Sequence, residues 1–156
     1  ANLINAEVLL KDRGIEIIEE SRSDFGAFSS SMAVETTGGG ATHRLVGTLF
    51  GNNMPRLVGV DDFRLEAYLD GDLVIFHHRD VPGIIGHIGT ELGKHGVNIA
   101  QMAVGRAERG GNAIGILNVD GEPSVEAIEA VRAVEGIESA DVVRLPAAGA
   151  SPDWLG

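Results

Sequence analysis

Residues 73–86 read LVIFHHRDVPGIIG, and this stretch decides the fold of the second half of the chain. The apolar run at 73–78 predicts a strand. Proline fits the first position of a helix, so Pro82 marks the start of a helix soon after that strand. The helix has one apolar face, formed at i, i+3 and i+7 by Ile85, Ile88 and Leu92.

The rest of the second half completes a recurrent order of elements. We expect strands at 97–106, 113–119 and 140–145, and a helix that starts near Ser124 and ends at Gly136. Together with the first strand and helix, the order is βαββαβ, which is the ferredoxin-like arrangement. Both helices should then cover one face of a four-stranded antiparallel sheet.

The first half predicts a helix followed by strands. The helix spans 6–13 and ends at Gly14, and an apolar run at 15–19 predicts a strand. An antiparallel meander follows, with turns between strands at 28–35, 42–50, 56–60 and 64–69. One helix is thin cover for this many strands, so this half is either incomplete or packs against another chain.

A turn at Asp70-Gly71 separates the two halves and sets the expected domains. Residues 1–71 form a partial, mostly antiparallel β domain with one helix, and residues 72–145 form the ferredoxin-like domain. The small, proline- and glycine-rich segment 146–156 is expected to be a flexible tail, with Trp154 exposed or docked on a neighbour. The fold class is α+β.

Composition limits the classes of partner. The chain has 156 residues, is 44% hydrophobic and carries a net charge of −11, which argues against nucleic acid or an anionic membrane as the main partner. It has no cysteine and no apolar stretch near the roughly 18 residues that a membrane helix needs. No signal peptide is visible, so we expect a cytoplasmic protein. The first residue is alanine, which indicates a processed chain or a piece of a longer one.

The common catalytic and metal-binding patterns do not occur in the sequence. Residues 89–94 resemble a P-loop, but the two glycines are too close together and His95 stands where serine or threonine is needed. His77 and His78 would point to opposite faces of one strand, so they could not share a metal ion. No nucleophile elbow or acid–base pair stands out. We therefore expect no catalytic residue, no metal and no cofactor in this chain.

The strand-to-helix segment from His78 to Gly83 offers a place for a ligand. Free amides at the start of a helix attract a carboxylate, and Asp80, just before the helix, can accept hydrogen bonds from an ammonium group. These two features suit the two ends of a free amino acid, with His78 able to hydrogen-bond it from the side. The competing interpretation is that Asp80 only caps the helix.

Two parts of the chain resemble known domains. Residues 73–86 and 92–100, which read LGKHGVNIA, resemble the ACT domain. Residues 2–15 and 56–64 resemble the intervening, or allosteric substrate-binding, domain of the long form in the D-3-phosphoglycerate dehydrogenase family. Because both motifs occur in one chain, the resemblance points to a C-terminal regulatory fragment of that family.

The resemblance implies a parent enzyme that uses NAD to oxidise 3-phosphoglycerate in serine biosynthesis. Its nucleotide-binding and catalytic domains would lie upstream of this chain, which would not catalyse the reaction by itself. Two alternatives stay open. One is the ACT-containing part of an L-serine dehydratase β subunit, and the other is a stand-alone amino-acid sensor or interaction protein.

In the family, serine binds between two ACT domains paired across a two-fold axis. The resemblance therefore implies a homodimer with L-serine or a similar amino acid at its seam. The ligand-binding residues that it implies are His78, Asp80, Val81, Gly83 and Ile84 from one chain and Asn98 from the other. Asp80 and His78 depart from family members with asparagine and an aromatic residue there. Asn98 has a second interpretation, as a left-handed residue leaving the helix.

The intervening domain of the family can also bind an anion. The matching strands of this chain carry Arg56 and Arg64, with His43 and Arg44 in a neighbouring strand. The guanidinium group suits phosphate because its N–H groups bind two oxygens at once. An arginine on an exposed strand face is the alternative interpretation.

Overall fold

The computed structural model describes residues 5–20, 30–51 and 54–150. Its elements are α1 (Ala6–Asp12), β1 (Ser31–Gly38), β2 (Ala41–Phe50), β3 (Met54–Val60), β4 (Phe63–Tyr68), β5 (Asp72–Arg79), α2 (Ile84–Lys94), β6 (Ile99–Arg106), β7 (Asn112–Val119), α3 (Val125–Arg132) and β8 (Ile137–Arg144). They form two four-stranded sheets with helices, which confirms the α+β class.

The first sheet is the expected meander, with strand order β1-β2-β3-β4 and antiparallel pairing throughout. The loop between β1 and β2 consists of Gly39 and Gly40, whose φ angles are 58° and 83°. Two consecutive positive φ angles are what a two-residue hairpin of the right twist requires, and glycine adopts them without strain. The glycine run therefore makes a turn, as its sequence predicts.

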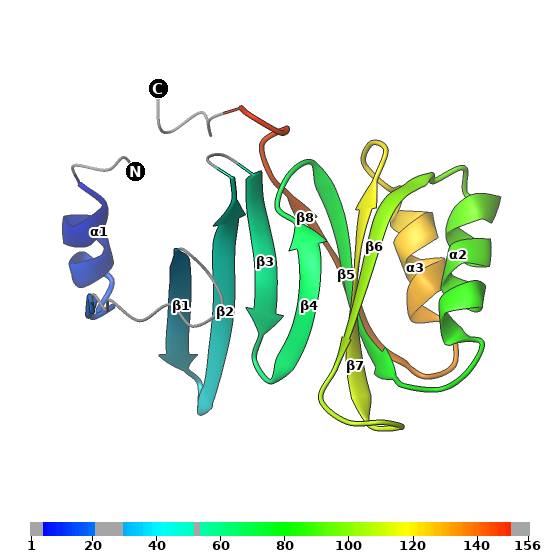
Figure 1. Cartoon of the computed structure of the whole chain (residues 1–156), viewed down its shortest axis with the longest axis horizontal. Helices are drawn as coiled ribbons and strands as arrows, with labels where there is room; N and C mark the ends of the chain where they lie inside the picture. Colours follow the sequence, from blue (N-terminus) through cyan, green and yellow to red (C-terminus); the bar gives the residue numbers. More distant parts are fainter. Residues whose placement is uncertain (1–4, 21–29, 52–53, 151–156) are drawn as a thin grey trace.

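The second sheet has the order β6-β7-β5-β8, and each neighbouring pair is antiparallel. This is the predicted βαββαβ unit. Helices α2 and α3 cover one face of it (Figure 1). Alternate residues of β5 point to that face, and the core beneath the helices includes Phe76, Ile88, Leu92, Leu117 and Val131.

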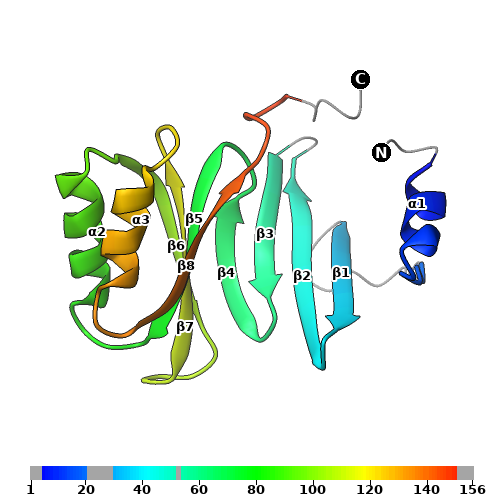
Figure 2. The same cartoon turned by 180° about the vertical axis from the view of Figure 1, so that it is seen from behind.

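The other face of the second sheet is covered by β3 and β4 of the first. The residues buried between the sheets are Leu57, Ala67, Ala103, Ile114 and Ile116. Figures 1 and 2 show the resulting layers, with the second sheet between the first sheet and the two helices. At Gly105 a side chain would meet the carbonyl oxygen of Arg64 at 2.8 Å, so β4 and β6 approach as closely as glycine allows.

The predicted strand at 15–19 is wrong, because residues 15–20 form neither helix nor strand. The strand predicted at 28–35 lies at 31–38. Residues 21–29 and Trp154 lie outside the described residues.

Helix α1 buries none of its residues, so the expectation that the meander packs on this helix is wrong. In Figure 1 it lies beyond β1, away from the sheet that it would have to cover. Met32, Val34 and Leu45 consequently stay 71%, 50% and 47% exposed on β1 and β2.

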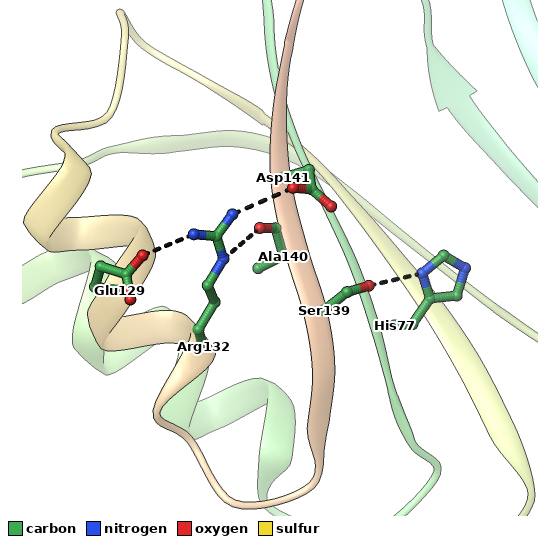
Figure 3. A network of polar contacts seen from close by, with 6 residues as sticks. All are labelled: His77, Glu129, Arg132, Ser139, Ala140 and Asp141. Carbon is green, nitrogen blue, oxygen red and sulfur yellow. Dashed lines mark hydrogen bonds and ion pairs between the residues drawn. The ribbon is translucent and has the colours of Figure 1, made fainter.

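One arginine ties helix α3 to strand β8 (Figure 3). Arg132 donates from Nε to the carbonyl oxygen of Ala140 at 2.8 Å. Its two Nη atoms bind the carboxylates of Glu129 at 2.7 Å and Asp141 at 3.2 Å. Arg132 thus joins the end of α3 to β8 through the Ala140 carbonyl oxygen and the Asp141 carboxylate.

Candidate binding site at the β5–α2 junction

Asp80 lies between the end of β5 and the start of α2, and it is held by the hairpin that follows β6. Its Oδ2 atom accepts one hydrogen bond from Arg106 Nη1 at 3.0 Å and another from the Gly110 N–H at 3.0 Å. The side chains of Asp80 and Arg106 are 25% and 57% exposed. These contacts therefore link the segment between β5 and α2 to the end of β6 and the hairpin loop after it, and they remain open to solvent.

The same contacts set the charge of Asp80. The N–H of Gly110, followed by the guanidinium of Arg106, holds the pKa of this carboxyl below its ordinary value. Both effects stabilise the ionised form, so Asp80 is a carboxylate at neutral pH. A carboxylate at this position suits a ligand that carries an ammonium group.

Asp80 does not cap helix α2, so that interpretation of the sequence is wrong. The N-cap residue is Gly83, with φ of 92° and no side-chain hydrogen bond. The first helical bond runs from His87 N–H to Gly83 O, and the N–H groups of Gly83 and Ile84 at the helix start donate to no backbone carbonyl within the described residues. The N–H of Val81 is already used, since it donates to Arg79 O at 2.9 Å.

His78 is the last buried residue of β5, with an exposure of 1%. Its Nδ1 atom lies 2.7 Å from the Arg79 carbonyl oxygen, which can only accept, so Nδ1 carries the proton. Its Nε2 atom is buried and has no hydrogen-bond partner among the described residues. Buried polar atoms without a partner are uncommon, so Nε2 is an unsatisfied nitrogen beside the ring of Phe76, on a residue two positions before Asp80.

Asn98 lies at the other end of the same sheet. Strands β5 and β6 both pair antiparallel to β7, so they are parallel to each other and both end near Asp80. Asn98 precedes the start of β6, about 25 Å from Arg106 by strand rise. One chain therefore brings His78 and Asp80 together but leaves Asn98 away from them.

The amide of Asn98 has a fixed orientation. Its Nδ2 atom donates to Asp120 Oδ2 at 2.6 Å, and a carboxylate can only accept, so the Oδ1 atom is the end left for another group. Asn98 is not left-handed, because Asp61 is the one non-glycine residue of the described chain with a positive φ. The left-handed interpretation of Asn98 is therefore wrong.

Sequence reasoning missed Arg106, Gly110 and Asp120. Arg106 is 26 residues from Asp80 along the chain, and the two meet because β6 and β5 end at the same edge of the sheet. The βαββαβ order contains that information, since it predicts parallel β5 and β6 with one strand between them. The direction in which the hairpin after β6 folds does not follow from the order.

The two arginines proposed for an anion, Arg56 and Arg64, share no ion-pair or ring partner within the described residues. Arg56 is 12% exposed, and its guanidinium lies 3.9 Å from the centre of the Tyr68 ring and 5.6 Å from that of Phe50. Arg64 is four residues from Tyr68 along β4, about 13 Å away. His43 pairs instead with Asp61 at 3.1 Å.

A cavity of about 310 Å³ lies beside Arg56. Its walls include Met54, Tyr68 and residues 146–150, the described part of the expected tail. The Nε atom of Arg56 is buried, lies 4.0 Å from Glu66 Oε1 and makes no hydrogen bond within the described residues. Arg56 thus lines the cavity and donates from Nη1 to the Pro55 carbonyl oxygen at 2.9 Å, while its Nε atom stays unsatisfied.

Neither a metal cluster nor a membrane helix is found in the described parts of the chain. His77 contacts Ser139 Oγ at 3.2 Å and the Phe63 ring, whereas His78 packs beside Phe76 under the helices, so the two point apart as expected. No group of three or more potential metal ligands stands together among these residues. None of their helices is long and apolar enough to span a membrane.

Comparison with known proteins assigns the two halves separately. Residues 1–61 match the model of the D-3-phosphoglycerate dehydrogenase intervening domain, and residues 73–136 match that of the ACT domain. The first match covers α1 and strands β1 to β3, and the second covers almost all of β5 and continues through α3, so β4 and β8 lie outside both matches.

Full-length relatives match across both halves. The D-3-phosphoglycerate dehydrogenase of Bacillus subtilis is 33% identical over 93% of this chain, and that of Methanocaldococcus jannaschii is 33% identical over 92%. That of Synechocystis is 39% identical over 76%. The aligned region is 28%, 27% and 22% of the three relatives, so the chain spans about a quarter of their length. This chain belongs to the D-3-phosphoglycerate dehydrogenase family and carries the intervening and ACT domains of that family.

Proposed function

We propose that this chain is the effector-binding part of a D-3-phosphoglycerate dehydrogenase and that L-serine binds between two copies of its ACT domain. The observation that carries the proposal is the placement of Asp80 and Asn98 at opposite ends of β6, which forms one edge of the second sheet. An antiparallel pairing of two β6 strands sets the end of one beside the start of the other. Each Asp80 then faces an Asn98 of the partner copy.

The edge of the second sheet suits such a pairing. A register that opposes Asn98 to Arg106 has its two-fold axis at Met102, midway between them. Met102 and Val104 are 46% and 43% exposed on this edge strand, so they present apolar surface where the second copy would lie. An unpaired edge with apolar side chains favours association, and a two-fold axis closes it into a dimer with two equivalent clefts.

The groups at each cleft match the parts of a free amino acid. The Asp80 carboxylate suits the ammonium, and the N–H groups of Gly83 and Ile84 suit the carboxylate. The partner's Asn98 supplies an amide oxygen, because its Nδ2 is held by Asp120. The unpaired Nε2 atom of His78 can hydrogen-bond a hydroxyl such as that of serine where the ligand reaches this buried position.

Binding at a shared cleft is a means of regulation. A ligand that contacts both copies binds one relative placement of the subunits more tightly than others, and it shifts the population towards that placement. The parent enzyme would use NAD to oxidise 3-phosphoglycerate in the cytoplasm, with its catalytic groups outside this chain. The intervening-domain match favours this parent over an L-serine dehydratase subunit or a stand-alone sensor.

Calorimetric titration of the 156-residue chain with L-serine tests the proposal, with glycine and D-serine as comparison ligands. We expect L-serine to bind and Asp80→Ala and Asn98→Ala each to weaken binding at least about tenfold, because each removes a hydrogen bond to a charged group. Asp62→Ala, an exposed carboxylate outside the cleft, is the matched control and should bind normally. Unchanged binding in both site variants would show that L-serine binds elsewhere, and no binding by the wild type would refute the function.

A small-anion site beside Arg56 is a second candidate, favoured by the buried Nε atom and the adjacent cavity. A phosphate or carboxylate oxygen there would complete the hydrogen bonding of a cation already stacked on Tyr68. Phosphate should raise the melting temperature of the wild type and not of Arg56→Gln. Equal shifts in both proteins, or none in either, would contradict this second site.

A further inference from the structure

The ion pair between Asp80 and Arg106 leaves part of each group unused. Both hydrogen bonds to Asp80 end on Oδ2, and Oδ1 makes none within the described residues. Arg106 uses only Nη1, so Nη2 and Nε keep their protons without an acceptor in the same part of the chain. An acceptor and several donors of opposite charge thus lie side by side at the surface.

The pair is also held in place from one side. Gly110 donates to the same Oδ2 atom through its backbone, and the Asp80 N–H donates to Gly111 O at 2.9 Å. The Asp80 carboxylate is thereby fixed on the hairpin, whereas Arg106 has one contact and a side chain that is 57% exposed. The arginine can change partner at low cost, because exposed ion pairs contribute little stability.

A zwitterionic amino acid has the matching arrangement of charges. Its ammonium and carboxylate are joined through one carbon atom, so they lie as near to each other as the two members of an ion pair. We propose that the Asp80–Arg106 pair is the recognition element for the α-ammonium and α-carboxylate, with Arg106 as the side-chain ligand of the carboxylate. This inference rests on the proposed amino-acid function and names the group that selects the α-amino-acid backbone.

The arrangement predicts selectivity for an intact zwitterion. A ligand with both charges can replace the Asp80–Arg106 contact by two new ones, ammonium to Oδ1 and carboxylate to guanidinium. A ligand with only the ammonium leaves the arginine on Asp80 and has to compete with it. Backbone N–H groups alone, at the helix start, would discriminate less between a carboxylate and a neutral amide.

The test measures binding of L-serine and of L-serinamide, which has a neutral amide in place of the carboxylate, to the full chain. The variants are Arg106→Gln, Arg106→Lys and, as a matched control, Arg109→Gln in the same hairpin. Wild type should prefer L-serine at least about tenfold, and Arg106→Gln should lose most of that preference through weaker L-serine binding. Arg106→Lys should recover part of it, and Arg109→Gln should behave as wild type.

The outcomes separate this inference from the function on which it rests. If L-serine binds wild type and Arg106→Gln equally, or if Arg106→Gln weakens L-serine and L-serinamide by the same factor, Arg106 does not bind the carboxylate. The inference is then overturned while the proposed function stands. If wild type binds no L-serine, the proposed function fails and this inference fails with it. Equal melting temperatures of the variants exclude misfolding as the cause.

Discussion

At the scale of a single residue, the contacts of Asp80 fix the position and the charge of its carboxylate in the candidate site. Its carboxylate is held by a backbone N–H and a guanidinium from a segment 26 to 30 residues away. Sequence reasoning could place His78, Asp80 and Asn98 at the ends of their strands, because turn and helix signals mark those ends. It could not supply Arg106, since that contact depends on how the hairpin after β6 bends back.

The pKa of Asp80 should depend on both of its donors. In a carbon-detected NMR titration we expect a pKa below the ordinary value of an aspartate in wild type. Arg106→Gln should raise this pKa only part of the way, because the Gly110 N–H is the larger cause. A wild-type pKa at or above the ordinary value would contradict the contact.

Because the pKa of Asp80 is lowered, the contribution of this residue to the stability of the fold depends on pH in one direction. A carboxyl group with a lowered pKa in the folded state stabilises that state above its unfolded pKa. The contribution is lost as the pH falls through the lowered value. The charge of Asp80 is thus constant at neutral pH, and it titrates only in acid.

At the scale of elements, the hairpins and the βαββαβ unit follow from the sequence, while the strand at 15–19 does not form. Ile15, Ile17 and Ile18 give part of the alternation of a strand, but a strand also needs a neighbour to bind its N–H and C=O groups. Residues 15–20 have no strand beside them in the described chain. The spacing of apolar residues indicates that a segment favours the strand conformation, but it does not show whether a sheet edge is free to pair with that segment.

Strand β7 contains a glycine that packing requires. A Cβ atom at Gly115 would overlap the ring of Phe76 on the neighbouring β5, whereas one at Gly89 on α2 would meet nothing within 4 Å. We expect Gly115→Ala to lower the free energy of unfolding by about 2 kcal/mol or more, as overpacking does. Gly89→Ala, the control, should be neutral or stabilise by about 0.5–1 kcal/mol.

Urea unfolding of the three proteins measures this difference. A Gly115→Ala variant as stable as wild type would show that Phe76 has room to move. The packing of β5 against β7 would then be looser than described.

At the scale of the whole molecule, the first sheet covers one face of the second and the helices cover the other, so the strand edges are where a partner can add. The sequence predicts both domains but not that β3 and β4 pack on the ACT sheet. That contact involves Leu57, Ala67 and the close approach at Gly105. No local sequence pattern predicts it. Strands β6 and β8 are the two edges of the second sheet, and the proposed dimer uses β6.

A charge on the β6 edge should separate the copies. Met102→Glu places two carboxylates next to the two-fold axis, where their repulsion and desolvation oppose pairing. We expect gel filtration to show a dimer for wild type and a monomer for the variant, with unchanged circular dichroism. Met32→Glu on β1 is the matched control, since Met32 is exposed in the other sheet, and it should stay dimeric. A Met102→Glu variant that remains dimeric would show that the dimer interface does not lie at β6.

The most direct test of a site shared between two copies is complementation. Asp80→Ala and Asn98→Ala chains are co-expressed, and L-serine binding is measured by calorimetry. A mixed dimer combines both substitutions in one cleft and leaves the other intact. Random pairing should therefore restore wild-type affinity at about one site per four chains, although each variant alone binds at least about tenfold more weakly than wild type. A mixture that binds no better than its components would contradict a cleft built by two subunits.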